Sequence, residues 1–115
     1  MPGTIFLELP VATTADARAF YEAAFGWHFT DFGPTYAATT AGAGTGASDM
    51  GLQADPAEKT AALLPVIEVD DLEATLAAVE RAGGTVTLPV FAFPGGRRFH
   101  FRDRDGHELA AMKAD

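Results

Sequence analysis

Residues 11–26 read VATTADARAFYEAAFG, and residues 69–84 read VDDLEATLAAVERAGG. When the chain is shifted by 58 positions against itself, the two stretches share a leading valine, two alanines, a glutamate and a closing glycine. Each begins with a polar turn that supplies a helix cap, Thr13 in the first copy and Asp70 or Asp71 in the second. Each continues as an alanine-rich helix and ends at glycine, a common helix terminator. The chain therefore predicts one βα unit, used twice.

Strand-like segments surround both predicted helices in the same order. They cover residues 5–11, 27–32, 35–39 and 49–53 in the first half, and 63–69, 85–93, 97–102 and 107–112 in the second. Pro89 is expected to interrupt the strand over 85–93. The repeated order β-α-β-β-β predicts an α+β fold in which two βαβββ modules in one chain form an open, barrel-like cleft. We expect a single domain, with module one over about residues 1–54, a linker over 55–61 and module two over about 62–115.

The composition is typical of one globular domain. With 115 residues, of which 48% are hydrophobic, the chain can build a core without disulfides. The absence of cysteine excludes thiol catalysis, cysteine metal sites and a disulfide framework. The first residues show no basic leader, and no run approaches the ~20 apolar residues of a membrane span, so we expect a cytoplasmic protein.

The net charge of −8 bears on the choice of partner. Nucleic-acid binding depends on basic residues that neutralise phosphates, and anionic membranes attract basic segments, so the sequence predicts neither partner. An acidic protein favours a cationic ligand, although surface carboxylates also serve solubility alone.

The order of motifs resembles a known family. Phe-Tyr at positions 20–21 precedes Gly-Trp at positions 26–27, and RFHFRD at 98–103 precedes DGHEL at 105–109. Together these motifs resemble the vicinal oxygen chelate superfamily, which includes glyoxalase I, extradiol dioxygenases, fosfomycin-resistance proteins and bleomycin-binding proteins. The last stretch is similar to the family's terminal Asp-Pro-Asp-Gly-Asn hairpin, with Arg104 in place of proline. The resemblance spans the whole chain and implies paired modules and a homodimer.

Enzymes of this superfamily place a divalent metal on His and Glu side chains from the first and last strands of each module. By the resemblance, three of these positions fall on Phe6, Leu64 and Ala110. The candidates for the fourth position, in the last strand of module one, are Asp49, Met50 and Gln53. Phenylalanine, leucine and alanine offer no lone pair to a metal, so we expect no metal site and no cofactor.

Glu8 is the strongest candidate for chemistry. It lies two residues after Phe6, so both side chains project from one face of a strand. A carboxylate among apolar side chains can act as a base, bind an amine, or simply be hydrogen-bonded within the core. Aromatic residues also cluster along the chain, where they line a ligand site or, more commonly, pack in a core. The candidate ligand-binding residues are Phe6, Glu8, Trp27, Tyr36, Met50, Leu64, Phe91, Phe93, Phe99 and Phe101.

The remaining polar candidates carry less weight. His28, His100 and His107 match no compact metal-binding spacing, and we expect them at the surface or in turns. Arg97 and Arg98 follow two glycines and could hold an anion, but we favour a solvated strand edge.

These observations favour a protein that binds a small organic molecule, aromatic or hydrophobic, and sequesters it without a metal. The resemblance to bleomycin-resistance proteins implies a drug or metabolite as ligand and a role in antibiotic resistance. Sequestration needs shape and stacking but no reactive group. The alternative is an enzyme of the same superfamily, a lyase, isomerase or dioxygenase, that uses Glu8 as a base or a metal bound by unrecognised residues. A third possibility, a structural partner in a larger complex, has no specific support in the sequence.

Overall fold

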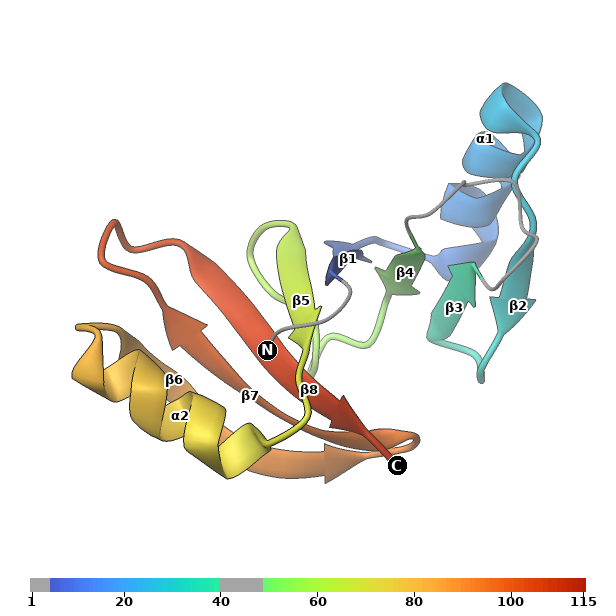
Figure 1. Cartoon of the computed structure of the whole chain (residues 1–115). Helices are drawn as coiled ribbons and strands as arrows, with labels where there is room; N and C mark the ends of the chain where they lie inside the picture. The colour runs from blue at the N-terminus through green and yellow to red at the C-terminus, as the bar shows by residue number, and fades with distance from the viewer. Residues whose placement is uncertain (1–4, 40–48) are drawn as a thin grey trace. The chain divides into compact units, whose positions relative to one another are not determined.

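The computed structural model describes residues 5–39 and 49–115, which form eight strands and two helices (Figure 1). The first five elements are β1 (Ile5–Pro10), α1 (Thr14–Phe25), β2 (Phe29–Asp31), β3 (Tyr36–Thr39) and β4 (Met50–Gln53). The second five are β5 (Leu64–Glu68), α2 (Leu72–Arg81), β6 (Thr85–Phe93), β7 (Gly96–Arg102) and β8 (Glu108–Ala114). The order β-α-β-β-β occurs twice, so the predicted α+β class with two βαβββ modules is confirmed.

The chain divides into two compact units, Phe6–Leu64 and Pro65–Asp115, with Ile5 counted in the second. We call the elements β1 to β4 with α1 module one, and β5 to β8 with α2 module two. In module one the strand order is β2-β3-β4-β1, and in module two it is β5-β8-β7-β6. The first and last strands of each module pair in parallel, whereas the other pairs are antiparallel. The two modules therefore repeat one sheet topology.

Both helices begin at the predicted caps. The backbone N–H of Asp16 donates to Thr13 Oγ1 over 3.2 Å, and that of Ala74 donates to Asp71 Oδ1 over 3.0 Å. Each bond satisfies one of the amides that a helix start leaves without an intrahelical partner. Helix α1 ends at Gly26, whose φ of 72° lies in the left-handed region that glycine adopts without strain. The cap of α2 is therefore Asp71 and not its neighbour Asp70.

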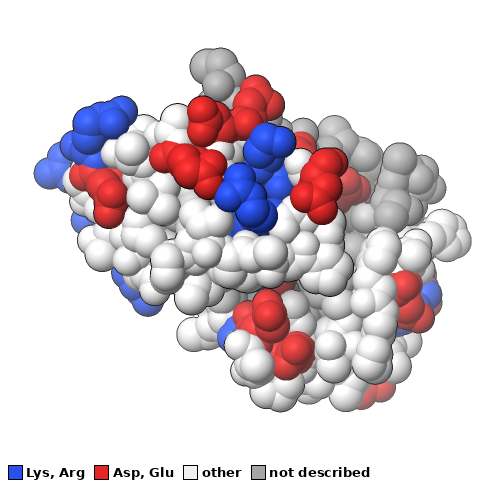
Figure 2. Space-filling model, turned by 90° about the horizontal axis from the view of Figure 1, so that it is seen from below, with Lys and Arg blue, Asp and Glu red and all other residues white. Residues whose placement is uncertain are grey.

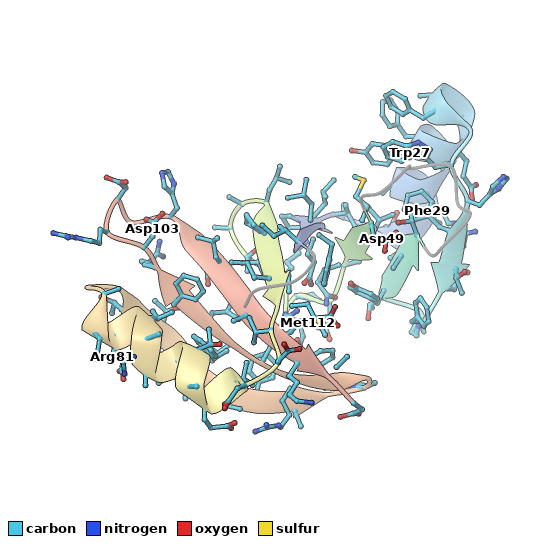
Figure 3. The ribbon with its side chains drawn as sticks, in the orientation of Figure 1. Trp27, Phe29, Asp49, Arg81, Asp103 and Met112 are labelled. Atoms are coloured by element: carbon cyan, nitrogen blue, oxygen red, sulfur yellow. The ribbon has the colours of Figure 1, made fainter. Side chains whose placement is uncertain are left out.

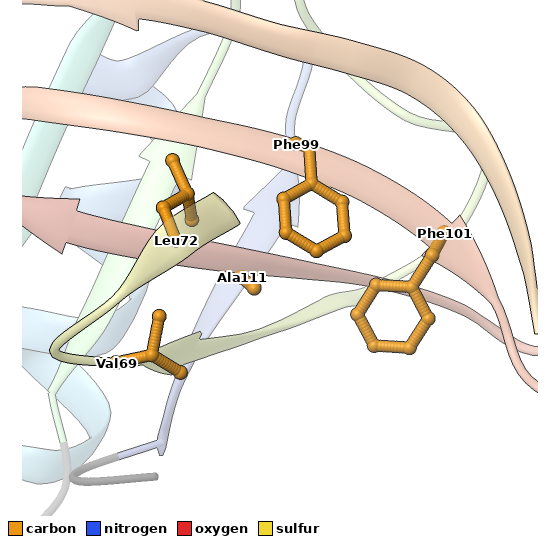
Figure 4. Close-up of a cluster of buried hydrophobic side chains, with 5 residues drawn as sticks. All are labelled: Val69, Leu72, Phe99, Phe101 and Ala111. Atoms are coloured by element: carbon orange, nitrogen blue, oxygen red, sulfur yellow. The ribbon is translucent and has the colours of Figure 1, made fainter. Parts of the chain in front are cut away.

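One face of each sheet packs against the helix of its own module. In module two a buried cluster fills this space, made of Val69, Leu72, Phe99, Phe101 and Ala111 (Figure 4). In module one the buried residues are Phe29, Ala37 and Leu52, with Tyr21 and Trp27 packed against them (Figure 3). Phe20, on α1, is 61% exposed.

Strand β6 continues through Pro89, contrary to the predicted interruption. Its pairing with β7 shifts in register between Val86 and Leu88 and again between Leu88 and Phe91. Since β6 pairs only with β7 among the described strands, Pro89 can lie in it without removing a hydrogen bond to a second neighbour. The shifts accommodate the missing amide and the strand remains continuous.

The register of β4 resolves the position that the sequence leaves open. Glu8 of β1 pairs with Gly51 of β4, just as Val66 of β5 pairs with Ala110 of β8. Glu8 and Val66 are themselves related by the 58-residue repeat. Gly51 is therefore the counterpart of Ala110 in module one.

Candidate functional site

Each sheet has a second face that its own helix does not cover, which we call the open face of that module. In module one, strand alternation and register assign Glu8, Tyr36, Gly51 and Gln53 to the open face. Phe6 lies two residues before Glu8 and shares this face. The open face of module one thus carries a carboxylate, a phenol and an amide within three neighbouring strands.

Glu8 is buried, with 4% of its surface exposed. Its Oε1 accepts a hydrogen bond of 3.4 Å from Gln53 Nε2. The backbone N–H of Asp55 donates to Gln53 Oε1 over 3.0 Å, which orients the amide so that its NH₂ group points at Glu8. A carboxylate held in this way is positioned to accept a proton or to bind a cationic group.

The open face of module two carries Arg98 and His100 on β7. His100 pairs with Ala110 of β8, and Ala110 pairs with Val66 of β5. On the other side of β7, Arg98 pairs with Phe91 of β6. On this face, Arg98 and His100 therefore have apolar side chains of β8 and β5 on one side and an aromatic side chain of β6 on the other.

His100 is 3% exposed, so the expectation of a surface or turn position is wrong for this histidine. Its Nδ1 lies 3.1 Å from Glu108 Oε2. His28 and His107 are exposed, as predicted. Alternation in β7 places His100 opposite its buried neighbours Phe99 and Phe101, but the sequence does not reveal that both faces of this central strand are buried.

Arg98 is 8% exposed, so the predicted solvated strand edge is also wrong. Strand β7 lies between β6 and β8 and has no free edge within module two. The guanidinium carbon of Arg98 lies 5.4 Å from the ring centroid of Phe91 and 5.6 Å from that of Phe93. These distances are within the range of cation–π attraction. Arg98, Phe91 and Phe93 therefore form a stacked group on the open face of module two. Both rings in this group are half-buried.

Arg97 points to the other side of β7 and pairs with Glu73 of α2 at 2.7 Å. The hydrogen bond from Arg97 lowers the pKa of the Glu73 carboxyl below its ordinary value. The Arg97 side chain is partly exposed and that of Glu73 largely exposed, and ion pairs in contact with solvent contribute little to stability. Of the two adjacent arginines, only Arg98 belongs to the open face.

Four of the predicted ligand-binding residues lie on the helix-covered faces. Phe99 and Phe101 belong to the cluster beneath α2, because they alternate with Arg98 and His100 along β7. Met50 alternates with Gly51 along β4 and pairs with Leu7. Trp27 stacks on Tyr21 with ring centroids 5.5 Å apart, beside α1. Phe99, Phe101 and Trp27 therefore belong to the clusters beside the helices, and alternation puts Met50 on the same face of its sheet as Leu52. The open faces retain Phe6, Glu8, Tyr36, Leu64, Phe91 and Phe93.

The metal positions implied by the family resemblance do not fit a metal. They correspond to Phe6 and Gly51 in module one, and to Leu64 and Ala110 in module two. None of these side chains has an oxygen, nitrogen or sulfur atom to donate. Within residues 5–39 and 49–115, no group of three or more His, Cys, Asp or Glu side chains is arranged to hold an ion.

Module two also has a groove of about 430 Å³ on its helix side, between α2 and the sheet. Apolar side chains form most of its lining, with Asp70, Asp71 and Thr75 among the polar ones. The volume is within the range of small-molecule sites. Asp71 caps α2, and the hydroxyl of Thr75 donates to the backbone carbonyl of Asp71, so these two polar groups are already hydrogen-bonded within the fold.

The surface charge agrees with the acidic composition. On the face drawn in Figure 2, acidic and basic side chains lie close together, and the described residues form no extended basic area there. In the part of the chain that the structure describes, neither helix has the length and apolar character needed to span a membrane.

Comparison with solved structures places the fold among known proteins. An NAD-dependent benzaldehyde dehydrogenase from Legionella pneumophila superposes with a TM-score of 0.78 at 17% identity, covering 97% of this chain and all of that one. A glyoxalase/bleomycin resistance protein/dioxygenase superfamily member from Vibrio splendidus 12B01 has a TM-score of 0.71 at 13% identity, over the full length of both chains. Methylmalonyl-CoA epimerase from Mycobacterium tuberculosis has a TM-score of 0.70 at 14% identity, covering 96% of this chain and 86% of that one. Identities this low establish a shared fold alone.

Comparison with curated proteins gives no match. The sequence profile of one family, in contrast, matches residues 5–111, which is nearly the whole chain. Its boundaries include both βαβββ modules, from β1 into β8. The chain belongs to the Glyoxalase/Bleomycin resistance protein/Dioxygenase superfamily.

Proposed function

We propose that this protein binds a small planar aromatic compound, a drug or metabolite, and sequesters it without the aid of a metal. The observation that carries the proposal is the stacked group on the open face of module two, where Arg98 lies over Phe91 and Phe93. Half-buried rings beside a guanidinium present flat surfaces to which another flat molecule can stack. The binding surface is therefore a stacking platform.

The side chains at the superfamily's metal positions support sequestration over metal-dependent catalysis. Phe6 and Gly51 in module one, and Leu64 and Ala110 in module two, supply no ligand atoms, so the polar groups of each open face have apolar neighbours. A ligand site of this kind is mostly apolar, with a few polar groups that orient the bound molecule. Each aromatic contact adds roughly 1 kcal/mol beyond the area it buries, so several contacts give micromolar affinity.

The test is a calorimetric titration of the purified protein with a panel of planar aromatic compounds, including aromatic antibiotics. We expect binding to the unmodified protein and at least a tenfold loss of affinity in Phe91→Ala, because one wall of the platform is removed. Phe20→Ala is the matched control, since Phe20 is 61% exposed on α1 and lies in module one. Equal affinities for both variants would show that the platform is not the binding surface.

The second candidate function is an enzyme that uses Glu8 as a general base. The observation in its favour is the burial of this carboxylate and its hydrogen bond to Gln53. A buried carboxylate that a neighbouring amide holds in place is positioned to take a proton from a substrate within hydrogen-bond reach. Exchange of a substrate's carbon-bound hydrogen for deuterium, measured by NMR, would support the enzyme if Glu8→Gln abolishes the exchange. Unchanged exchange in Glu8→Gln would remove this candidate.

A further inference from the structure

His100 has a buried ring nitrogen that the described part of the fold leaves unsatisfied. Within residues 5–39 and 49–115, Nε2 is buried and has no hydrogen-bond partner, whereas Nδ1 lies 3.1 Å from Glu108 Oε2. Buried polar atoms in native proteins are nearly always paired, with protein, water or a ligand atom. The Nε2 atom of His100 is therefore positioned to contact a molecule that is not part of the chain.

Glu108 determines the form in which the imidazole meets such a molecule. An ionised carboxylate only accepts hydrogen bonds, so Nδ1 donates its hydrogen to Glu108. The neutral ring then has its lone pair at Nε2. Glu108 Oε2, 3.1 Å from Nδ1, is the nearest countercharge for an imidazolium formed when Nε2 accepts a proton. In this arrangement Glu108 orients the imidazole, and Nε2 is the atom that can accept a proton.

The surroundings of His100 define the kind of molecule that could reach it. The imidazole ring lies 6.0 Å, centroid to centroid, from the half-buried ring of Phe91. Arg98 lies over the same phenylalanine ring and adds a positive charge to this part of the face. The charged groups that alternation assigns to this face are Arg98 and Arg102 on β7, Glu108 on β8 and Glu68 on β5. A ligand's aromatic ring beside Phe91 would have its edge close to Nε2 of His100, which can accept a proton.

We propose that the ligand carries an acidic aromatic hydroxyl and that Nε2 of His100 takes the proton of this hydroxyl on binding. The ligand's O–H bond breaks, its electron pair stays on oxygen as a phenolate, and an N–H bond forms at His100. Glu108 balances the imidazolium, and the proton returns to the oxygen when the ligand leaves. The inference rests on the proposed function, since it names the chemical class of the aromatic compound that the platform binds.

The test uses 4-nitrophenol, whose phenolate is coloured, and 4-nitroanisole, which has the same ring but no acidic proton. Absorbance is followed against pH with and without excess protein, and affinities are measured by calorimetry. We expect the pH midpoint for ionisation of bound 4-nitrophenol to fall by about one unit, a tenfold change in ionisation. 4-Nitroanisole should bind at least tenfold more weakly.

Variants separate the role of His100 from a loss of folding. His100→Gln should abolish the shift, and Glu108→Gln should reduce it because the imidazolium loses its countercharge. His107→Gln, an exposed histidine in the neighbouring turn, is the matched control and should leave the shift unchanged. Near-ultraviolet circular dichroism confirms that each variant is folded. If His100→Gln does not fold, the test relies on Glu108→Gln, because the Glu108 side chain is 28% exposed and less embedded in the core.

Each outcome has a separate meaning. Binding of both probes with equal affinity and no shift overturns the assignment of an acidic hydroxyl and leaves the proposed function standing. A shift that survives in His100→Gln and Glu108→Gln also overturns it. If no member of the aromatic panel binds, the proposed function fails and this inference fails with it.

Discussion

The hydroxyl group of Tyr36 occupies the space that a side chain at position 51 would need. A Cβ atom placed on Gly51 would collide with this hydroxyl and lie 3.0 Å from Tyr36 Cζ. Because Gly51 pairs with Glu8, its missing side chain allows the phenol ring to approach the strand next to the buried carboxylate. Gly51 therefore has two consequences: it removes a metal-ligand position, and it admits Tyr36.

We predict that Gly51→Ala destabilises the protein by about 1–3 kcal/mol, because the added methyl group forces Tyr36 out of its position. In a Tyr36→Ala background the same change should cost much less. A double-mutant cycle from urea unfolding measures the coupling between the two positions. Additive effects would mean that Tyr36 moves aside without cost.

Phe99→Ala should destabilise the protein by about 3–5 kcal/mol, because Phe99 is fully buried in the cluster beneath α2 (Figure 4). Phe91→Ala should be less destabilising, because Phe91 is half-buried, and should act mainly on ligand affinity. Chemical denaturation compared with ligand titration distinguishes the two. Loss of affinity in a stably folded Phe99→Ala protein would contradict the assignment of Phe99 to the core.

Asp103 should make stability depend on acid pH. Its Oδ1 accepts hydrogen bonds of 2.9 Å from the backbone N–H groups of His107 and Asp105, and these bonds lower its pKa. A lowered pKa in the folded state contributes stability above the ordinary value of 3.8, and this contribution is lost as the pH falls through the folded-state pKa. The destabilisation caused by Asp103→Asn should therefore be larger at neutral pH than well below pH 3.8.

Asp105→Asn is the matched control for this prediction, since it removes the same charge from the same turn. Urea unfolding of both variants at several pH values gives the comparison. A constant difference between Asp103→Asn and the unmodified protein at all pH values would contradict the proposed linkage.

We predict that the purified protein contains no stoichiometric divalent metal, because the four positions implied by the family lack ligand atoms. Elemental analysis after incubation with zinc, nickel, manganese and iron salts measures this. A one-to-one metal content that is lost in Glu8→Gln or His100→Gln would overturn the prediction and favour the enzyme.

Much of the local structure follows from the sequence. Thr13 and Gly26 cap the two ends of α1, as the sequence predicts. A helix cap depends only on a few neighbouring residues and their backbone preferences. Alternation likewise places Glu8 with Phe6, since neighbouring side chains in a strand project to opposite faces. The succession β-α-β-β-β along the chain follows from local sequence patterns, and its recurrence after 58 residues is visible by comparing the chain with itself.

The tertiary structure alone decided which polar groups are buried and which residues distant in sequence contact each other. The hydrogen bond between Gln53 and Glu8 joins residues 45 positions apart, and the register that pairs Glu8 with Gly51 depends on such distant contacts. Alternation separates His100 from Phe99, but it does not say that both faces of β7 are buried. Strand pairing and burial are set by the whole fold, because they depend on segments that are remote in sequence. The sequence therefore determined the modules and their helices, whereas the buried His100–Glu108 pair emerged only from the way the strands of module two assemble.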